Sequence, residues 1–267
     1  MAALDLFEEI HNIILVADAE KKCRAVHDLH KNIKTYSFKS KSTAKEISLP
    51  GYPKSLTLVP PKQLKRRGIQ QQEGRNILLH AVAHIEYNAI NLALDAAYRF
   101  RGQETQYYLD WIRVADDEAR HFELIQAYLK KNDCDYGHYP AHNGLWDMAV
   151  RTQDNLTARM ALVPRVLEAR GLDVTPGMIE KLKRVNDLNA VHILEIIYRD
   201  EIEHVAIGSY WFKYQCKLQN LEPRSTFRSM VDTHLYGELR GPFNLVARLK
   251  AGFDEQEMQE LEKGFDS

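Results

Sequence analysis

Two short stretches of this chain share one pattern: an aspartate and a glutamate, with a histidine three residues after the glutamate. They are Asp117-Glu-Ala-Arg-His121 and Asp200-Glu-Ile-Glu-His204, and each lies in a long run of helix-forming residues. Side chains three residues apart on a helix share a face, so each glutamate projects together with its histidine. A further glutamate precedes the glutamate of each pair at a matching distance, Glu86 by 32 positions and Glu168 by 33.

This repeated spacing predicts two helical hairpins of the same design, each with a glutamate on its first helix and Glu-x-x-His on its second. Four carboxylates and two imidazoles on four facing helices form the ligand set of a ferritin-like dinuclear metal site. We therefore predict an all-α fold built on a ferritin-like four-helix bundle. The predicted metal ligands are Glu86, Glu118, His121, Glu168, Glu201 and His204.

The faces on which these residues lie support metal binding. In helical projection Glu86 lies at the centre of an apolar face, and Glu118 and His121 lie on a second one. The apolar residues around Glu86 are Leu79, Val82, Ala83, Ala89, Ile90, Ala93 and Ala97. The alternatives are chance spacing and buried salt bridges, but few cations are available to pair with the acids. Because an isolated charge is very costly to bury, the pattern favours a metal site.

Two aspartates and two histidines lie close to the predicted ligands in sequence. Asp117 and Asp200 lie at the edge of the ligand face, where a carboxylate can accept the second N–H of a metal-bound histidine. We predict that they orient the ligand histidines. His80 and His84 point away from the face of Glu86, so we predict polar contacts with the N-terminal segments rather than metal binding.

Several local strings resemble a known family. Glu86 followed after thirty residues by Asp117-Glu-Ala-Arg-His121 is similar to the signature of the di-iron carboxylate oxygenases and their ferritin-like relatives. Further strings are His84-Ile-Glu86, Glu168-Ala-Arg-Gly-Leu-Asp-Val-Thr-Pro176, Asp200-Glu-Ile-Glu-His204 and Gly241-Pro-Phe-Asn244. Together they resemble a bacterial ferritin-like family, catalogued as a domain of unknown function, in the superfamily of di-iron ferritins, rubrerythrins and oxygenases. The resemblance extends from about Leu56 to Phe253 and implies a fold and a metal site.

The chain divides by composition into three parts of one domain. Residues 1–75 hold an N-terminal helical segment and a basic, Pro-rich strap. Residues 76–218 form the predicted bundle, and residues 219–267 form a C-terminal helical extension. Asp254 with Glu257 predicts a capping box at the start of the last helix.

The bundle helices are expected over residues 76–100, 105–131 and 145–170, the third kinked at Pro164 and ended by Gly171. Thr175-Pro176 has the pattern of an N-cap followed by a first-turn proline and is expected to open the next helical segment. Because Gly171 follows Glu168 so closely, we predict that the fourth bundle helix starts near Asn186, antiparallel to the third.

The strap is strongly basic. Residues 31–75 hold eleven Lys or Arg against two Glu, a charge of +9, so the rest of the chain carries about −10. Such a segment could bind RNA or another polyanion. We favour a strap that wraps an acidic bundle, because its aromatic residues are too sparse for a base-stacking platform.

The cysteine content and the distribution of charged and apolar residues indicate the cellular compartment and argue against cysteine-based metal sites. Three separated cysteines without Cys-x-x-Cys argue against a rubredoxin-type iron centre, a zinc knuckle or a disulfide framework. The N-terminus is acidic where a signal peptide needs basic residues, and we expect no apolar run of the roughly 18 residues that a membrane span requires. The chain is expected to be cytoplasmic, without membrane contact.

Imidazole and carboxylate ligands suit iron or manganese. We therefore predict two Fe ions, or Mn, or a mixed Mn/Fe pair, in an oxidase or hydroxylase that uses O₂ or peroxide on a small-molecule substrate. An external electron donor is required, and the sequence assigns no catalytic residue beyond the metal ligands. The alternatives are iron or peroxide handling of the rubrerythrin or ferritin kind, and a non-catalytic, metal-stabilised interaction bundle. A tRNA hydroxylase-like activity is a weaker specific option, and a homodimer remains open.

Overall fold

The computed structural model describes residues 4–39, 42–64, 68–235 and 239–263. These residues are mostly helical, as predicted. Strand structure within them is limited to the parallel pair β1 (Leu4–Asp5) and β2 (Tyr36–Ser37) and one isolated bridge. The prediction of an all-α fold is therefore confirmed.

The chain forms two compact units, which are described separately. The first comprises residues 1–150 and 181–193, and the second comprises residues 151–180 and 194–267. The helices of the first unit are α1 (Leu6–Leu15), α2 (Ala19–Lys31), η1 (Ile33–Thr35), η2 (Pro61–Gln63), α3 (Gln72–Arg99), α4 (Thr105–Lys131) and most of α5 (Gly144–Arg151).

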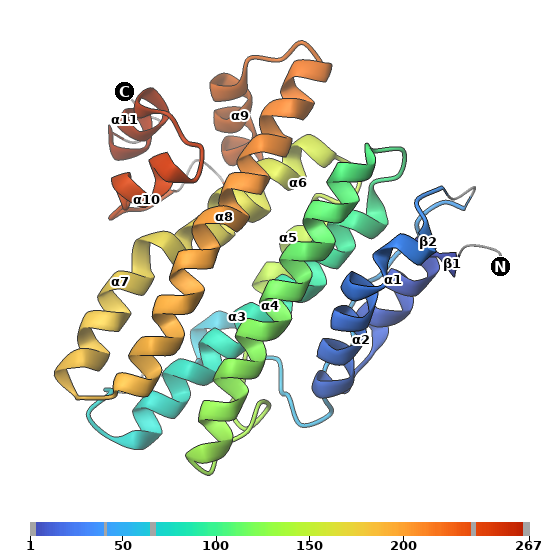
Figure 1. Ribbon diagram of the computed structural model, residues 1–267. Coiled ribbons are helices and arrows are strands. Elements are labelled where there is room, and N and C mark those ends of the chain that lie inside the picture. The colour runs from blue at the N-terminus through green and yellow to red at the C-terminus, as the bar shows by residue number, and fades with distance from the viewer. Residues whose placement is uncertain (1–3, 40–41, 65–67, 236–238, 264–267) are drawn as a thin grey trace. The chain divides into compact units, whose positions relative to one another are not determined.

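The core of the first unit is the hairpin of α3 and α4, whose turn contains Gly102 with a φ of 75°. On this hairpin α1 packs against α3, and α2 packs against α4 (Figure 1). Two aspartates start the outer helices. The Asp5 carboxylate accepts from the backbone N–H of Phe7 at 2.8 Å, and that of Asp18 accepts from Lys21 at 2.9 Å. Such caps satisfy backbone donors that have no partner inside the helix.

Lys22 joins three parts of the first unit. Its side chain is fully buried, and Nζ donates to the carbonyl of Ile14 at 2.9 Å, that of Gly51 at 3.2 Å and Oδ1 of Asn91 at 2.5 Å. These acceptors belong to α1, the Pro-rich segment and α3. Burial lowers the pKa of Lys22 to about 7. The lysine thus fixes the strap at Gly51 against the helical core.

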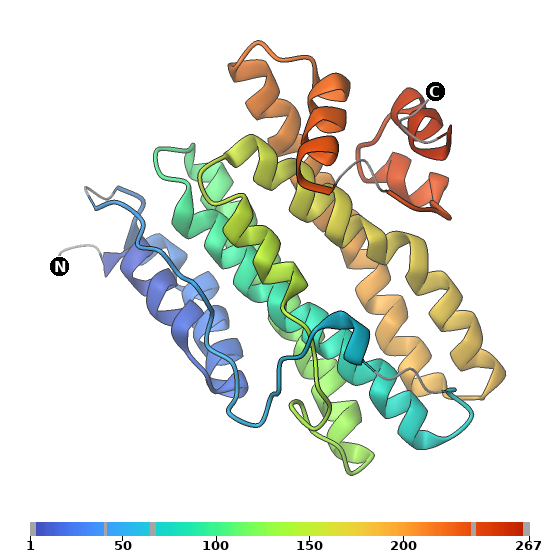
Figure 2. The same cartoon turned by 180° about the vertical axis from the view of Figure 1, so that it is seen from behind.

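The described part of the Pro-rich segment, which belongs to the first unit, contacts other parts of that unit at several points. Tyr52 donates to Oδ1 of Asn88 on α3 at 2.7 Å, and farther along Leu58 pairs with Ala141 in the connection between α4 and α5 (Figure 2). Part of the predicted basic segment, residues 40–41 and 65–67, lies outside the described residues.

Among the described residues, one helix, α3, is long and apolar enough to cross a membrane, and an 18-residue stretch of it has a mean hydropathy of 1.2. From the sequence we expected no apolar run of that length. However, 78% of that stretch of α3 is buried inside the protein. Burial of this kind is typical of the core helix of a soluble protein.

The second unit is also helical. Its elements are α6 (Leu156–Leu162), the π-helical segment η3 (Val163–Glu168), most of α7 (Ala169–Arg184) and of α8 (Leu188–Leu218), α9 (Pro223–Leu235), α10 (Leu245–Lys250) and α11 (Glu255–Lys263). Helices α7 and α8 run antiparallel, joined by a short turn with Asn186 at a φ of 57° (Figure 1). The predicted start of a helix near Asn186 is therefore confirmed.

The predicted helix over residues 145–170 begins where expected, since α5 starts at Gly144, but it is not continuous and it does not end where predicted. The helix ends at Arg151, and Asn155 then caps α6 by accepting from the N–H of Ala158 at 3.0 Å. Beyond η3 the helix does not stop at Gly171 but continues as α7. The deviation expected at Pro164 does occur, as the π-helical segment.

Pro176 lies inside α7 and not at a helix start. A proline within a helix leaves the carbonyl four residues earlier without its N–H donor. That carbonyl belongs to Leu172, and it accepts a hydrogen bond from Nδ2 of Asn244 at 3.1 Å. A contact between segments distant in sequence therefore compensates for the proline.

The predicted capping box at the last helix is confirmed. The N–H of Glu257 donates to Asp254 at 2.8 Å, and the N–H of Asp254 donates to Glu257 at 2.9 Å. The carboxylate of Glu257 also accepts from Nη2 of Arg165 at 2.5 Å, which ties α11 to η3. The cap thus serves the packing of the second unit as well as the helix start.

Candidate metal centre

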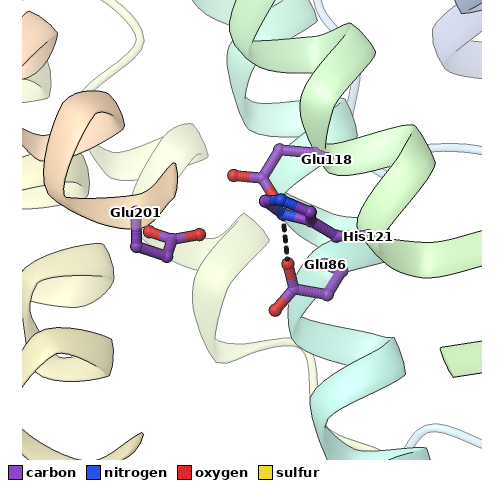
Figure 3. A group of neighbouring side chains, drawn as sticks. All are labelled: Glu86, Glu118, His121 and Glu201. Atoms are coloured by element: carbon purple, nitrogen blue, oxygen red, sulfur yellow. Dashed lines mark hydrogen bonds and ion pairs between the residues drawn. The ribbon is translucent and has the colours of Figure 1, made fainter. Parts of the chain in front are cut away.

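Three predicted ligands meet inside the first unit. Glu86 lies on α3, and Glu118 and His121 lie on α4, with exposed fractions of 3%, 0% and 0%. Nδ1 of His121 is 3.3 Å from Oε2 of Glu86 and 3.4 Å from Oε2 of Glu118 (Figure 3). The ligand atoms of these three residues lie within 4.8 Å of one another. We call this group the first half-site.

The hairpin explains why these residues meet. Glu86 precedes Gly102 by 16 residues and Glu118 follows it by 16, so a tight turn at Gly102 brings both to one level of two antiparallel helices. The apolar neighbours predicted around Glu86 are buried, among them Leu79, Ala83 and Ile90. Hydrophobic packing of α3 on α4 therefore directs the three polar side chains inward.

The first half-site has the donor chemistry of a transition-metal site. Two carboxylates and one imidazole suit iron or manganese better than a soft, thiolate-binding metal. Burying carboxylates is favourable only when they are paired, hydrogen-bonded or bound to a cation. The contacts of His121 with both glutamates partly meet that requirement.

A second pair of predicted ligands lies on α8 in the second unit. Glu201 and His204 are buried, with exposed fractions of 9% and 2%, and Nδ1 of His204 is 3.7 Å from Oε1 of Glu201. Glu168 ends the π-helical segment η3 and is partly buried. We call these three residues the second half-site. Figure 3 draws Glu201 with the first half-site.

The position of Glu168 follows from a close contact within the second unit. A Cβ added to Gly208 would lie 2.2 Å from Cβ of Pro164, so the two residues are level on antiparallel helices. Glu168 lies four residues beyond Pro164 in the π-helical segment, and His204 and Glu201 lie four and seven residues before Gly208 on α8. Glu168 therefore lies on the same side of this contact as His204 and Glu201. The role of Glu168 stays a prediction.

The two aspartates predicted to orient the histidines contact arginines of their own helices. Asp117 is 3.1 Å from Nη2 of Arg120, and Asp200 is 2.9 Å from Nε of Arg199. Both carboxylates are partly exposed, at 32% and 18%. Their influence on the ligand histidines stays a prediction.

His80 and His84 lie among polar contacts, but mainly with the connection between α4 and α5 and not with the N-terminal helices. Nε2 of His80 accepts from the N–H of Gly137 at 2.9 Å, and Nδ1 of His84 is 2.8 Å from the Tyr136 hydroxyl. The strap contributes Tyr52, whose ring stands 5.8 Å from His84. Burial lowers the pKa of both histidines to about 4, so they are neutral at physiological pH.

Comparison with known proteins places the chain in a family. Residues 15–259 match the family described as "Protein of unknown function (DUF455)". The chain belongs to the DUF455 family. An "Uncharacterized protein" of Haemophilus influenzae (strain Rd) is 40% identical over 266 residues, covering 94% of this chain and 92% of that protein. No solved structure matches the chain.

Membership of DUF455 agrees with the resemblance to a family of unknown function, and the match covers more of the chain than the predicted span. These comparisons do not link the chain to the ferritin-like superfamily, so that part of the resemblance stays a prediction. Family membership supplies no ligand, substrate or partner. The assignment of a metal centre therefore depends on the two half-sites.

One set of polar residues escaped the sequence analysis. Arg240 and Arg248 line a cavity in the second unit, and Asp173 holds Arg248 through hydrogen bonds to its guanidinium group. Asp173 and its neighbours fall inside a string quoted for the family resemblance, whereas Arg240 and Arg248 flank the string Gly241-Pro-Phe-Asn244. These two strings contain or adjoin the residues of the cavity, but their spacing along the chain did not predict that the two segments would lie together.

Proposed function

We propose that this chain is a ferritin-like protein in which the two half-sites together hold a pair of iron ions, with manganese or a mixed pair as variants. The buried cluster of Glu86, Glu118 and His121 carries this proposal, because three predicted ligands from two helices converge in an apolar interior. The repeated spacing of Glu168, Glu201 and His204 supports a matching contribution from the second unit. A ferritin-like four-helix bundle is the architecture we propose for this centre.

The residues of the first half-site fit such ions chemically. Glu86 and Glu118 offer negative charge, and His121 offers a nitrogen ligand whose Nδ1 contacts both carboxylates. A cation that binds at this nitrogen must displace any proton held there, so metal binding releases protons at low pH. The burial of all three side chains keeps bulk water away and strengthens their electrostatic interactions.

The function supported best by this ligand set is an oxidase or hydroxylase that uses O₂ or peroxide on a small-molecule substrate. The residues of the two half-sites would hold the iron, which would supply electrons to the oxidant, and the protein would orient these ligands and exclude water from them. An external donor must return the electrons, since the three cysteines form no Cys-x-x-Cys pair for a built-in iron centre. We also propose a cytoplasmic location, where such donors are available.

Metal analysis joined to an oxygen reaction tests the proposal. The purified protein is expected to contain close to two transition-metal ions per chain. Anaerobic reduction followed by exposure to air should change the visible absorption of an iron-loaded sample. A protein that retains no transition metal after reconstitution with ferrous iron would refute the proposed centre. Full metal loading without any reaction with oxygen or peroxide would instead favour a metal-stabilised interaction bundle.

The same sample separates oxidase chemistry from peroxide handling, iron storage and action on tRNA. Rapid consumption of peroxide without an organic substrate would favour rubrerythrin-like peroxide handling, and accumulation of many ferric ions per chain would favour storage. Action on tRNA requires binding through residues 31–75, with affinity that falls steeply as salt rises. We expect no RNA binding at physiological salt. A sub-micromolar RNA complex under those conditions would favour a tRNA hydroxylase.

A further inference from the structure

A cavity of about 450 Å³ in the second unit is lined by four arginines: Arg165, Arg170, Arg240 and Arg248. Its remaining described lining residues are apolar and include Phe243, and no carboxylate is among them. The volume is within the range of small-molecule sites. A pocket lined by several cations and by apolar side chains is suited to an anion that carries an apolar body.

Arg165 is the most buried of these cations. Its exposed fraction is 0%, and Nη2 donates to Glu257 at 2.5 Å. Among the described residues, Nε and Nη1 have no hydrogen-bond partner. Three phenylalanine rings surround the guanidinium, with centroids 4.5 to 4.7 Å from its central carbon. Aromatic faces stabilise the charge but do not accept hydrogen bonds as oxygen does. An anion in the cavity would supply an acceptor of that kind.

The part of the lining that includes Arg170, Arg240 and Arg248 is held by hydrogen bonds. Arg248 makes two hydrogen bonds to the carboxylate of Asp173, at 2.9 and 2.7 Å. Asp173 also accepts from the N–H of Asn244 at 2.9 Å, and Nη1 of Arg170 donates to the carbonyls of Arg240 and Pro242 at 3.0 and 3.3 Å. These bonds join the segment 240–248 to the start of α7. The cavity is therefore preorganised, which lowers the entropic cost of binding.

The charges leave an excess of cations in this part of the lining. Asp173 serves both Arg248 and, at 3.7 Å, Arg170, so one carboxylate faces two guanidinium groups. The side chain of Arg170 is 45% exposed, and the contacts of its guanidinium group given above are all made by Nη1. Guanidinium groups bind phosphate oxygens in pairs, and a phosphate monoester offers three peripheral oxygens and nearly two negative charges. A carboxylate offers only two oxygens and one charge.

We propose that this arginine cavity binds the phosphate group of a small organic phosphate whose apolar part contacts Phe243. The site involves none of the six predicted metal ligands. The proposed phosphate site is therefore independent of the proposed metal function, and its test requires no metal.

Calorimetric titration of the full chain with phenyl phosphate tests the proposal. Saturable binding is expected, weakening as salt rises because the contacts are charged. Benzyl alcohol and benzoate have an aromatic ring without a phosphate. They should bind at least about tenfold more weakly, because they cannot make all the charge-assisted hydrogen bonds that a phosphate makes. Inorganic phosphate serves as the probe for the anion alone and should bind more weakly than phenyl phosphate if Phe243 contacts the apolar part.

Three matched variants locate the site. Arg170→Gln and Arg240→Gln should each weaken phenyl phosphate binding by about tenfold or more. Arg228→Gln on α9 removes the same charge at a position away from the cavity and should leave binding unchanged. Circular dichroism checks that each variant is folded. Equal affinity in all three variants and the native chain, equal loss in Arg228→Gln, or binding of benzoate as tight as that of phenyl phosphate would each overturn the proposal.

Discussion

Gly208 of α8 lies against Pro164 of the π-helical segment so closely that a Cβ on Gly208 would be 2.2 Å from Cβ of the proline. Glu168 lies on the same side of this contact as His204 and Glu201. We expect Gly208→Ala to lower the free energy of unfolding by about 1–3 kcal/mol, because the new methyl group overpacks the helix contact. Urea denaturation followed by circular dichroism measures the change.

Gly171→Ala is the matched control for this substitution. Gly171 is also helical, but a Cβ there meets no atom within 4 Å. Alanine should therefore stabilise the protein by roughly 0.5–1 kcal/mol through its better helix propensity. If Gly208→Ala were as well tolerated as Gly171→Ala, the helices would not be in the close contact described.

Removal of one predicted ligand from either half-site should lower metal content. Glu118→Ala and His204→Ala are each expected to reduce bound iron or manganese. The melting temperature should fall as well, since metal that binds only the folded state stabilises it. Glu203→Ala changes an exposed glutamate one residue from His204 and should retain the native content. Full loading of both ligand variants would refute the assignment.

His80 makes stability depend on pH in the acidic range. Its pKa is lowered by burial from 6.5 to about 4 in the folded protein. The unfolded chain therefore binds more protons between these values, and the free energy of unfolding falls as pH drops from 6.5 to 4. Protonation would also place a proton on Nε2, which accepts from Gly137. The loss from His80 reaches on the order of 3 kcal/mol at pH 4, at 1.36 kcal/mol per pKa unit.

The variant His80→Gln retains an acceptor and removes this titration. Urea denaturation at several pH values should show a shallower loss of stability between pH 6.5 and 4 in the variant. His84, whose pKa shifts in the same direction, remains and keeps part of the slope. His192→Gln, at an exposed position, is the control. An identical slope in His80→Gln and the native chain would show that His80 does not titrate as described.

Lys22→Met should destabilise the first unit. The substitution removes the donor that the Ile14 carbonyl, the Gly51 carbonyl and the Asn91 amide oxygen share. The two carbonyls keep a second donor each, the N–H of Gly51 at 2.9 Å and the hydroxyl of Tyr87 at 2.8 Å. Oδ1 of Asn91 loses the donor that holds it, and a buried acceptor left unpaired costs about 1–3 kcal/mol. We expect a loss of about that size by urea denaturation, and no comparable loss in Lys21→Met, where the lysine is exposed. A near-neutral Lys22→Met would show that the three bonds contribute little.

The correct sequence predictions were those that depend on local periodicity and capping. Asp254 with Glu257 predicted the start of α11. The start of α8 near Asn186 was also predicted correctly, although the argument for it, a helix end at Gly171, was wrong. The spacing of Glu86, Gly102 and Glu118 was enough to predict that α3 and α4 would bring ligands together, because both helices turn at one glycine.

The wrong predictions concern places where a distant contact outweighs a local signal. Gly171 and Thr175-Pro176 have the pattern of a helix end and a new start, yet α7 continues through them. The reason is Asn244, whose side chain occupies the Leu172 carbonyl that Pro176 leaves without a donor. The break before α6 was missed for a different reason, since Asn155 is a local capping signal that the long apolar pattern obscured.

By itself the sequence determined the helical class, the resemblance to a family of unknown function and the positions of six candidate ligands, three of them on apolar helix faces, because spacing along a helix fixes which side chains share a face. Only the tertiary structure decided that Glu86, Glu118 and His121 meet in a buried cluster, that Gly208 lies against Pro164, and that four arginines line one cavity. These relationships join segments that are distant in the chain. They depend on packing between helices, which no local pattern encodes.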